Sequence, residues 1–392
     1  MKITKVTPYS INTTGWRNFN YVRVDTDEGI HGVGEAFCIG PDAAWMECVR
    51  YFEPWLVGRD PLERERLQQY LVNISRFPGG LMLGAAFSAI DLALWDIAGK
   101  AAGLPVYKLL GQVRDKVPTY THLHAGDPKS GKPSDPQMAL DMALAKREKC
   151  GYHAAKVMLG EVGYWPVGSS EKVLEKTMQV LREGLGDDFE IGVEMMTRTY
   201  NPVQAIRYCK AIEPFRPMFA EEVIRPERIE DMAEVQRRVN FPIATGEQLM
   251  NIYDFDRLIR HEAATVLQPD ILIVGGMTVM RKIAHLAEPT HRVIMPHNCL
   301  SPLTNCINVH FCMATPNAVM LENEPVTDGP AADLVTVKLK HDKDGYLTPP
   351  EGPGWGLDLN WEYLKQLPPK VWARNSIDSP NSSYPDGSVH PL

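Results

Sequence analysis

The sequence predicts an α/β protein, a (β/α)7-8 barrel preceded by an α+β unit. Between about residues 118 and 325, short apolar runs alternate with amphipathic helical patterns. This alternation is typical of parallel strands joined by crossover helices. Some two hundred residues hold seven or eight such units, which favours a closed barrel over an open sheet.

The first part of the chain has a different pattern of predicted secondary structure, a hairpin followed by helices. A strand begins at Tyr21, the turn at residues 27–29 follows, and HGVGEAFC supplies the hairpin partner. Three helical patterns come next, one from Pro41, one after Pro61 and one over residues 83–99. The GxG in HGVGEA lacks a third glycine and a βαβ context, so it is a weak nucleotide-binding signal.

Composition narrows the function classes. The 392 residues include 41 Lys and Arg against 49 Asp and Glu, a net charge of −8. This balance argues against a nucleic-acid partner, although local cations can still hold an anionic small substrate. The seven cysteines form no Cys-x-x-Cys pair, and the N-terminus lacks an apolar signal core. We expect a cytoplasmic protein with reduced thiols and no membrane partner.

The barrel units share one feature that points to chemistry. Each of the apolar runs AAKVML, FEIGVE, PMFAEE, FPIATGE, TVLQPD, RVIMPH and AVMLEN carries an ionisable residue at or near its end. Any one of these residues could be a helix cap or a solvated loop residue. In a barrel, however, the carboxyl ends of all strands meet at one face, so the recurrence predicts one site. These residues are Lys156, Glu194, Glu221, Glu247, Asp270, His297 and Glu322.

Three of these side chains are consecutive glutamates, Glu194, Glu221 and Glu247. Like charges ~4 Å apart repel by ~4 kcal/mol at an effective dielectric constant of ~20, so the trio requires a cation or protons. An all-carboxylate set suits a hard cation such as Mg²⁺. His297 is an acid/base candidate that Asp270 could orient, and Lys156 could neutralise developing negative charge.

The chain resembles the enolase superfamily, specifically its mandelate racemase subgroup and most nearly the galactonate-dehydratase-like members. The resemblance is carried by MKITKVTPY, VDTDEGIHGVGEA, KLLGQVRDKV, FAEEVIRPE, IATGEQL, LQPDILIVGGMT and MPHNCLSP. It implies an α+β capping domain over residues 1–117 and a modified TIM-like barrel over residues 118–325. Residues 326–392 would then return to the capping domain.

The resemblance also implies an activity, which is abstraction of the proton α to a carboxylate through an enediolate, with one Mg²⁺ per subunit. The most favoured reaction is dehydration of a sugar acid to a 2-keto-3-deoxy acid. The expected substrate is a small carboxylate and the expected assembly a homo-oligomer. The implied catalytic residues are His297, Asp270, Lys156 and Glu322, the metal ligands are Glu194, Glu221 and Glu247, and the substrate-binding residues are Trp16, Arg17, His122, His124, Met196 and Arg198.

Three positions depart from the pattern of the subgroup. Glu194 stands where the first metal ligand is usually Asp. Met158 replaces the second lysine of Lys-x-Lys, and Met196 replaces the histidine that galactonate-dehydratase-like members carry. Two expected bases are therefore absent, and the His297–Asp270 dyad remains. A dehydration could use His297 alone, first as base and then as acid.

Other interpretations stay open. His122, His124 or Tyr164 could replace the missing base, which would allow a racemase or epimerase. The two methionines also allow a non-catalytic protein that binds acid sugars. Arg198 could pair with a substrate carboxylate or with a glutamate of the barrel.

Overall fold

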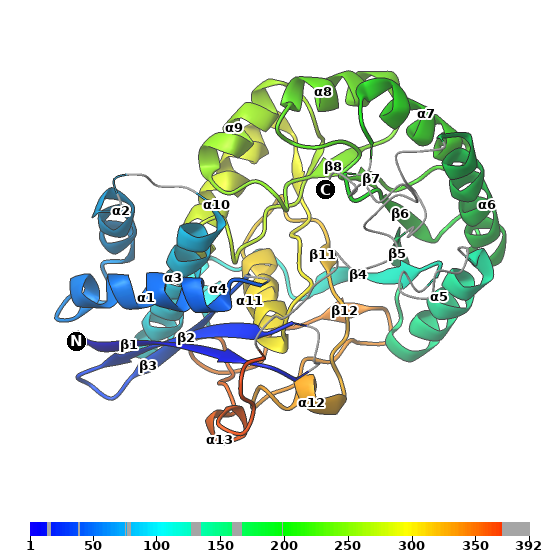
Figure 1. The fold of residues 1–392 in the computed structure, drawn as a ribbon. Coiled ribbons are helices and arrows are strands. Elements are labelled where there is room, and N and C mark those ends of the chain that lie inside the picture. The colour runs from blue at the N-terminus through cyan, green and yellow to red at the C-terminus, as the bar shows by residue number, and fades with distance from the viewer. Residues whose placement is uncertain are drawn as a thin grey trace.

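Two lobes lie side by side, a smaller cap and a larger barrel (Figure 1). The computed structural model describes residues 1–13, 17–37, 40–74, 76, 80–126, 135–158, 167–197 and 199–370. The cap consists of β1 (Ile3–Ile11), β2 (Phe19–Thr26), β3 (His31–Ala36), α1 (Asp42–Leu56), α2 (Arg64–Ile74), α3 (Leu81–Ala102) and α4 (Val106–Leu110).

The cap sheet is an antiparallel meander in the order β1-β2-β3, and α3 packs against β3. Two glycines allow this close approach, because a Cβ on Gly32 or Gly34 would lie 2.0 Å from a carbonyl oxygen of α3. By length and composition α3 could cross a membrane, but 78% of its most apolar stretch is buried. A long apolar helix of this kind is what a domain core requires.

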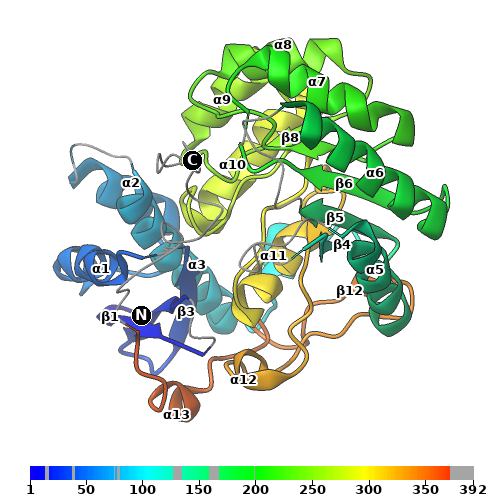
Figure 2. The same cartoon turned by 45° about the vertical axis from the view of Figure 1, so that its right-hand side comes forward.

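In the described part of the chain, eight strands build the barrel, and crossover helices cover their outside (Figures 1 and 2). The strands are β4 (Val117–His124), β5 (Ala154–Met158), β6 (Glu190–Glu194), β7 (Ala220–Glu221), β8 (Ile243–Thr245), β9 (Val266–Leu267), β10 (Val293–Ile294) and β11 (Leu321–Glu322). The helices are α5 (Pro136–Cys150), α6 (Val167–Leu185), α7 (Pro202–Ile212), α8 (Ile229–Arg238), α9 (Ile252–Arg260), α10 (Gly276–Ala287) and α11 (Pro302–Met313), with 3₁₀ turns η1 (Glu213–Phe215) and η2 (Glu288–Thr290).

These eight strands pair in parallel in the order β10-β9-β8-β7-β6-β5-β4-β11. A parallel bridge between Ile294 and Ala318 joins β10 to the residues before β11, which closes the circuit. The barrel class predicted from the alternating pattern is therefore confirmed. All eight strands present their carboxyl ends at one face.

The last described segment contacts both lobes. It contains α12 (Gly329–Ala332), β12 (Tyr346–Leu347) and α13 (Trp361–Leu364). β12 pairs antiparallel with β4 of the barrel. In the cap, the indole N–H of Trp355 donates to the carbonyl of Val33 at 3.0 Å. The predicted domain boundaries at residues 117 and 325 stay a prediction.

Candidate active site

Strand register places the first two glutamates of the trio side by side. Glu194 ends β6 and Glu221 ends β7, and the two are paired residues in this parallel ladder. Glu247 follows β8 by two residues. One carboxylate oxygen from each of the three lies within 4.8 Å of the others. The oxygen-only donor set and this spacing fit a hard divalent cation.

Protein groups hold these carboxylates in place. The amide of Gln268 donates to Glu221 Oε2 at 2.6 Å, and the backbone N–H of Met196 donates to Glu194 Oε1 at 2.7 Å. Burial, together with the charge of Glu194, raises the pKa of Glu221 well above its usual range. The trio is thus an acidic cluster whose ionised form needs positive charge nearby.

Lys156, on β5, supplies positive charge inside the described site. Its Nζ lies 2.5 Å from Glu221 Oε1, 2.8 Å from Glu322 Oε1 and 3.1 Å from Glu194 Oε2. Burial alone would lower the pKa of Lys156, but these carboxylates raise it well above its ordinary value. The ammonium group is therefore fixed at the centre of the strand ends.

His297 and Asp270 form a dyad after β10 and β9. The imidazole Nδ1 lies 2.7 Å from Asp270 Oδ2, and Asp270 Oδ1 accepts from the Leu272 N–H at 2.7 Å. The other ring nitrogen, Nε2, is 3.2 Å from Glu247 Oε2. Burial would lower the pKa of His297, but Cys299, Glu247 and Asp270 raise it well above its ordinary value. The dyad has the geometry of a base oriented by a carboxylate.

Glu322 ends β11 and joins His122 to the site. Its Oε1 pairs with His122 Nε2, and its Oε2 accepts from the backbone N–H of Asn298 at 2.8 Å. Burial would raise the pKa of Glu322, whereas Lys156 and His122 lower it well below its ordinary value. Asn298, which directly follows the base candidate in the chain, is not among the residues predicted for the site.

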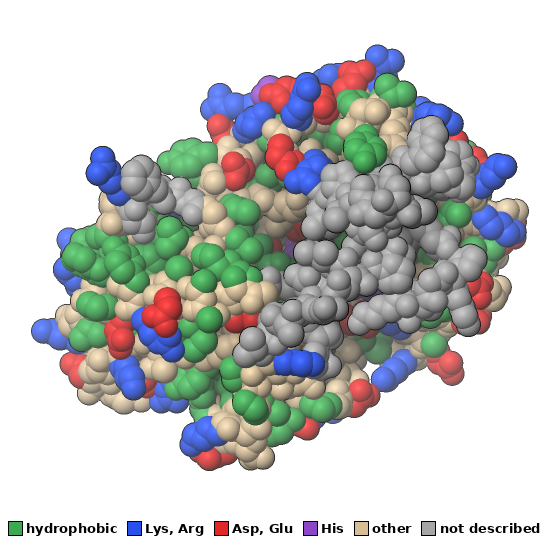
Figure 3. All heavy atoms as spheres, in the orientation of Figure 1, with side chains coloured by type: hydrophobic (Ala, Val, Ile, Leu, Met, Phe, Trp, Pro, Cys, Tyr) green, Lys and Arg blue, Asp and Glu red, His purple; other side chains and the backbone are tan. Residues whose placement is uncertain are grey.

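A cavity of about 900 Å³ opens over these groups, and Figure 3 looks into the hollow between cap and barrel. Most of the described residues predicted for the site line this cavity: Arg17, His122, His124, Lys156, Glu194, Met196, Glu247, His297 and Glu322. Glu221 and Asp270 lie behind these, and Trp16, Arg198 and Tyr164 lie outside the described residues. The lining also contains residues that the prediction missed, including Phe37, Arg225, Gln248 and Glu324.

The missed residues fall into two kinds. Arg225, Gln248 and Glu324 follow the strand-end residues by one to four positions, so a wider search after each strand would have found them. Phe37 comes from the cap, and no pattern in the barrel sequence points to it. Capping residues reach the site only through the contact between lobes.

The two methionines lie across the barrel from the dyad. Met196 follows β6, which is four strands from β10, and Met158 ends β5, which is four strands from β9. Both line the cavity. The described side chains facing His297 at these positions therefore cannot transfer protons.

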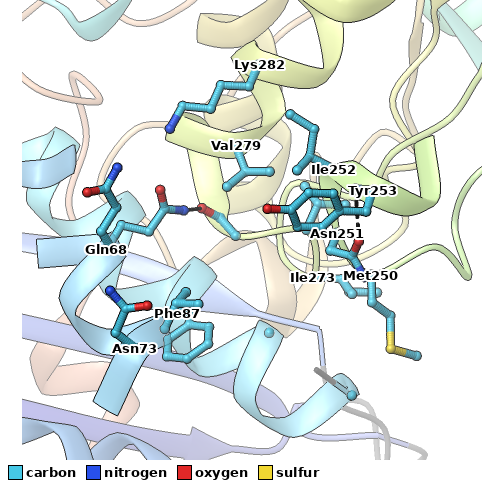
Figure 4. A pocket seen from close by; sticks show the side chains of 16 residues that line it. Gln68, Asn73, Phe87, Met250, Asn251, Ile252, Tyr253, Ile273, Val279 and Lys282 are labelled. Carbon is cyan, nitrogen blue, oxygen red and sulfur yellow. Dashed lines mark hydrogen bonds between the residues drawn. The ribbon is translucent and has the colours of Figure 1, made fainter. Parts of the chain in front are cut away.

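A second cavity of about 560 Å³ lies where the cap meets the barrel (Figure 4). Gln68 and Phe87 come from the cap helices, while Tyr253 and Val279 come from the barrel helices. Its lining is mostly apolar. Met250 and Ile273 line both cavities and so separate this one from the acidic site.

Comparison with known families identifies both lobes. Residues 2–111 match the mandelate racemase/muconate lactonizing enzyme N-terminal domain, and residues 139–363 match the enolase C-terminal domain-like family. The chain belongs to the mandelate racemase/muconate lactonizing enzyme family. The family resemblance predicted from the sequence motifs is thereby confirmed.

Individual members of this family align over nearly the whole chain. A D-galactonate dehydratase of Pectobacterium atrosepticum is 32% identical over 400 residues, covering 99% of each protein. A D-galactonate dehydratase of Ralstonia pickettii is 31% identical and covers 92% of each.

Two solved structures of similar proteins contain ligands. An enolase from Agrobacterium radiobacter with bound Na and L-malate is 32% identical, with a TM-score of 0.90 and complete coverage of both chains. An enolase from Pantoea ananatis with bound D-gluconate and Mg is 27% identical, with a TM-score of 0.88 and complete coverage of both chains.

Proposed function

We propose that the protein dehydrates a sugar acid, removing the proton α to the carboxylate and the hydroxyl of the next carbon to yield a 2-keto-3-deoxy acid. The observation that carries this proposal is a site with one acid/base dyad. His297 and Asp270 stand on one side of the cavity, and Met158 and Met196 stand across from them. Removal of a proton and a hydroxyl from the same face needs only one such group.

Glu194, Glu221 and Glu247 would hold one Mg²⁺ per subunit, because three carboxylates within 4.8 Å suit an oxygen-seeking cation. The ion would supply positive charge that stabilises the negative charge developing on the substrate carboxylate. Lys156 adds a fixed ammonium group beside Glu194 and Glu221.

The dyad then performs the proton transfers. In the form with a neutral ring, His297 takes the α proton at Nε2, and Asp270 stabilises the resulting imidazolium through Nδ1. As the enediolate collapses, the C–O bond of the neighbouring carbon breaks and His297 returns its proton to the departing hydroxyl, which leaves as water. The enol product tautomerises to the 2-keto acid.

The cavity also suits a hydroxylated chain. His122, His124, Arg225 and Glu324 place donors and acceptors around a volume of about 900 Å³. The D-galactonate dehydratases and the D-gluconate-bound enolase among the relatives favour six-carbon aldonic acids as the first substrates to test. Assembly as a cytoplasmic homo-oligomer stays a prediction.

The experiment is a screen of aldonic and aldaric acids with Mg²⁺, read for 2-keto-3-deoxy acid and for ligand-induced stabilisation. We expect product from at least one acid, and we expect His297→Asn to lower kcat by about 10³-fold or more while the acid still binds. Full turnover by His297→Asn would overturn the mechanism. Stabilisation by acids without product from any of them would instead indicate an acid-binding protein.

A second candidate, an epimerase, is favoured by the position of His122. This imidazole lines the cavity and pairs with Glu322, so the described site contains a second ring able to transfer a proton. Reaction in D₂O separates the two functions. An epimerase returns a deuterated epimer of its substrate, whereas a dehydratase yields keto acid.

A further inference from the structure

The segment between β10 and α11 carries His297 and is held from both lobes. On the barrel side, Asp270 binds the imidazole and Glu322 accepts from the Asn298 N–H. On the cap side, the guanidinium of Arg17 donates to the carbonyl of Cys299 at 2.5 Å. Four residues separate the base from the beginning of α11, so the ends of this short segment determine where the imidazole lies.

Glu35, on β3 of the cap, holds the far end of that segment. It is fully buried, and its Oε2 accepts from the hydroxyl of Ser301 at 2.5 Å and from the hydroxyl of Thr304. Ser301 is also the N-cap of α11, because its Oγ accepts from the Leu303 N–H at 3.1 Å. A single carboxylate from the cap lobe therefore fixes the point at which the segment that carries His297 joins α11.

The same strand end contacts the base directly. Phe37 follows β3, and its ring meets the imidazole of His297 edge to face, with centroids 5.8 Å apart. Residues 35 and 37 point to the same side of an extended chain. The end of β3 thus touches both the ring of His297 and the segment that carries it.

We propose that Glu35 is a positioning residue through which the cap sets the orientation of His297. The inference rests on the proposed role of His297 as acid/base. The side chain of Glu35 accepts hydrogen bonds from two hydroxyls, and an oxygen can accept these bonds without carrying a negative charge. Burial raises the pKa of Glu35 to about 7, which agrees with an accessible neutral form. A glutamine at position 35 should therefore accept the same two hydrogen bonds.

A second buried carboxylate of the cap serves as the control. Asp96, on α3, is also a fully buried carboxylate, and it accepts from the backbone N–H groups of Val33 and Trp355 at 3.0 Å each. Its partners lie in the cap and in the C-terminal segment. A change at Asp96 perturbs the junction without touching the segment that carries His297.

The test compares Glu35→Ala, Glu35→Gln and Asp96→Asn by steady-state kinetics on whichever acid the screen identifies. We expect Glu35→Ala to lower kcat about 10- to 100-fold with KM changed less than about threefold, because a misplacement of about 1 Å costs on this order. Glu35→Gln should stay within about threefold of the wild type. Asp96→Asn should lower the melting temperature and leave kcat unchanged.

A spectroscopic arm works without a substrate. The Nδ1–H of His297, hydrogen-bonded to Asp270, should give a downfield proton resonance that is assigned by its loss in His297→Asn. We expect this resonance to shift or disappear in Glu35→Ala and to persist in Glu35→Gln and Asp96→Asn. If Glu35→Ala does not fold, the isosteric Thr304→Val removes one of the two hydroxyls and should shift the resonance.

Two results would overturn the proposal. One is a folded Glu35→Ala protein with an unchanged His297 resonance. The other is a loss of kcat in Glu35→Ala that is no larger than the loss in Asp96→Asn. If the screen finds no substrate while the resonance responds as expected, the positioning role stands and only the proposed reaction fails.

Discussion

Single buried charges decide much of the behaviour of this site. Lys156 contacts Glu194, Glu221 and Glu322, all of them buried. Removing one partner of a buried ion pair costs about 3–5 kcal/mol, because the remaining charges lose their compensation. The ammonium group therefore stabilises the fold as well as the proposed intermediate.

We expect Lys156→Met to melt well below the wild type in EDTA and to gain more stability from added Mg²⁺, since the cation restores positive charge beside the trio. Thermal unfolding with and without Mg²⁺ measures both effects. Lys116→Met is the control, because Lys116 forms an exposed pair with Asp342 that solvent screens. Equal melting temperatures for the two variants would contradict the expectation.

We expect the buried histidine His310, which lies outside the active-site cavity, to make the folded protein less stable in acid. Its Nδ1 accepts from the Tyr107 N–H at 3.2 Å, and its Nε2 lies 3.1 Å from the carbonyl of Trp355. Burial lowers the pKa of His310 to about 4, below the ordinary value of about 6.5 in the unfolded chain. Between these values the unfolded state binds the extra proton, so stability is complete above pH 6.5 and falls as the pH decreases towards 4.

The measurement is urea unfolding of the wild type and His310→Gln at pH 7 and pH 4. A glutamine amide can make both hydrogen bonds without titrating. We expect the wild type to lose about 3 kcal/mol more than the variant between the two pH values. Parallel stability curves for the two proteins would contradict this expectation, because they would show that His310 binds its proton equally in the folded and unfolded states.

At the scale of elements, the sequence predicts most of what the structure contains. The helical patterns from Pro41, after Pro61 and over residues 83–99 correspond to α1, α2 and α3. The strands β7 to β11 are only two or three residues long, so Asp270 and His297 follow their strands by three residues. Strand order along the chain was sufficient to bring these side chains together despite the short strands.

Contacts between lobes could not be predicted in this way. Glu35 and Ser301 are 266 residues apart, and no sequence pattern indicates that they are in contact. A buried carboxylate held by hydroxyls leaves no periodic signal, unlike an amphipathic helix or an apolar strand. The site was therefore predictable from the barrel repeat, whereas in the cap Arg17 was predicted only through the family resemblance and Phe37 was missed.

The contact of β3 with α3 gives a prediction at this scale. A Cβ on Gly34 would lie 2.0 Å from the carbonyl oxygen of Ala89, and backbone atoms cannot move aside cheaply. We expect Gly34→Ala to lower the free energy of unfolding by several kcal/mol, measured by urea titration. Gly29→Ala should cost only about 1 kcal/mol, because Gly29 has a φ of +78° but open space around it. Similar losses in both variants would contradict the close-packing argument.

For the whole molecule, the C-terminal segment connects the lobes. Trp355 is fully buried, its backbone N–H donates to Asp96 and its indole donates to Val33. Further along, Asp358 pairs with His31 at 2.6 Å, while β12 adds to the barrel strand β4. The segment therefore couples cap stability to barrel stability.

Trp355→Ala tests this coupling. Loss of a buried tryptophan costs about 3–5 kcal/mol, and here the loss falls on the contact between lobes. We expect calorimetry to resolve the single transition of the wild type into two, with the cap melting first, and hydrogen exchange to lose protection in β1–β3 and α3 before the barrel. Trp361→Ala is the control, because Trp361 is only partly buried on the same segment, where it packs near Tyr9 and Arg23. If Trp355→Ala instead lowers the melting temperature of one undivided transition, cap and barrel unfold as a single unit. The segment then stabilises that unit and does not couple two separate ones.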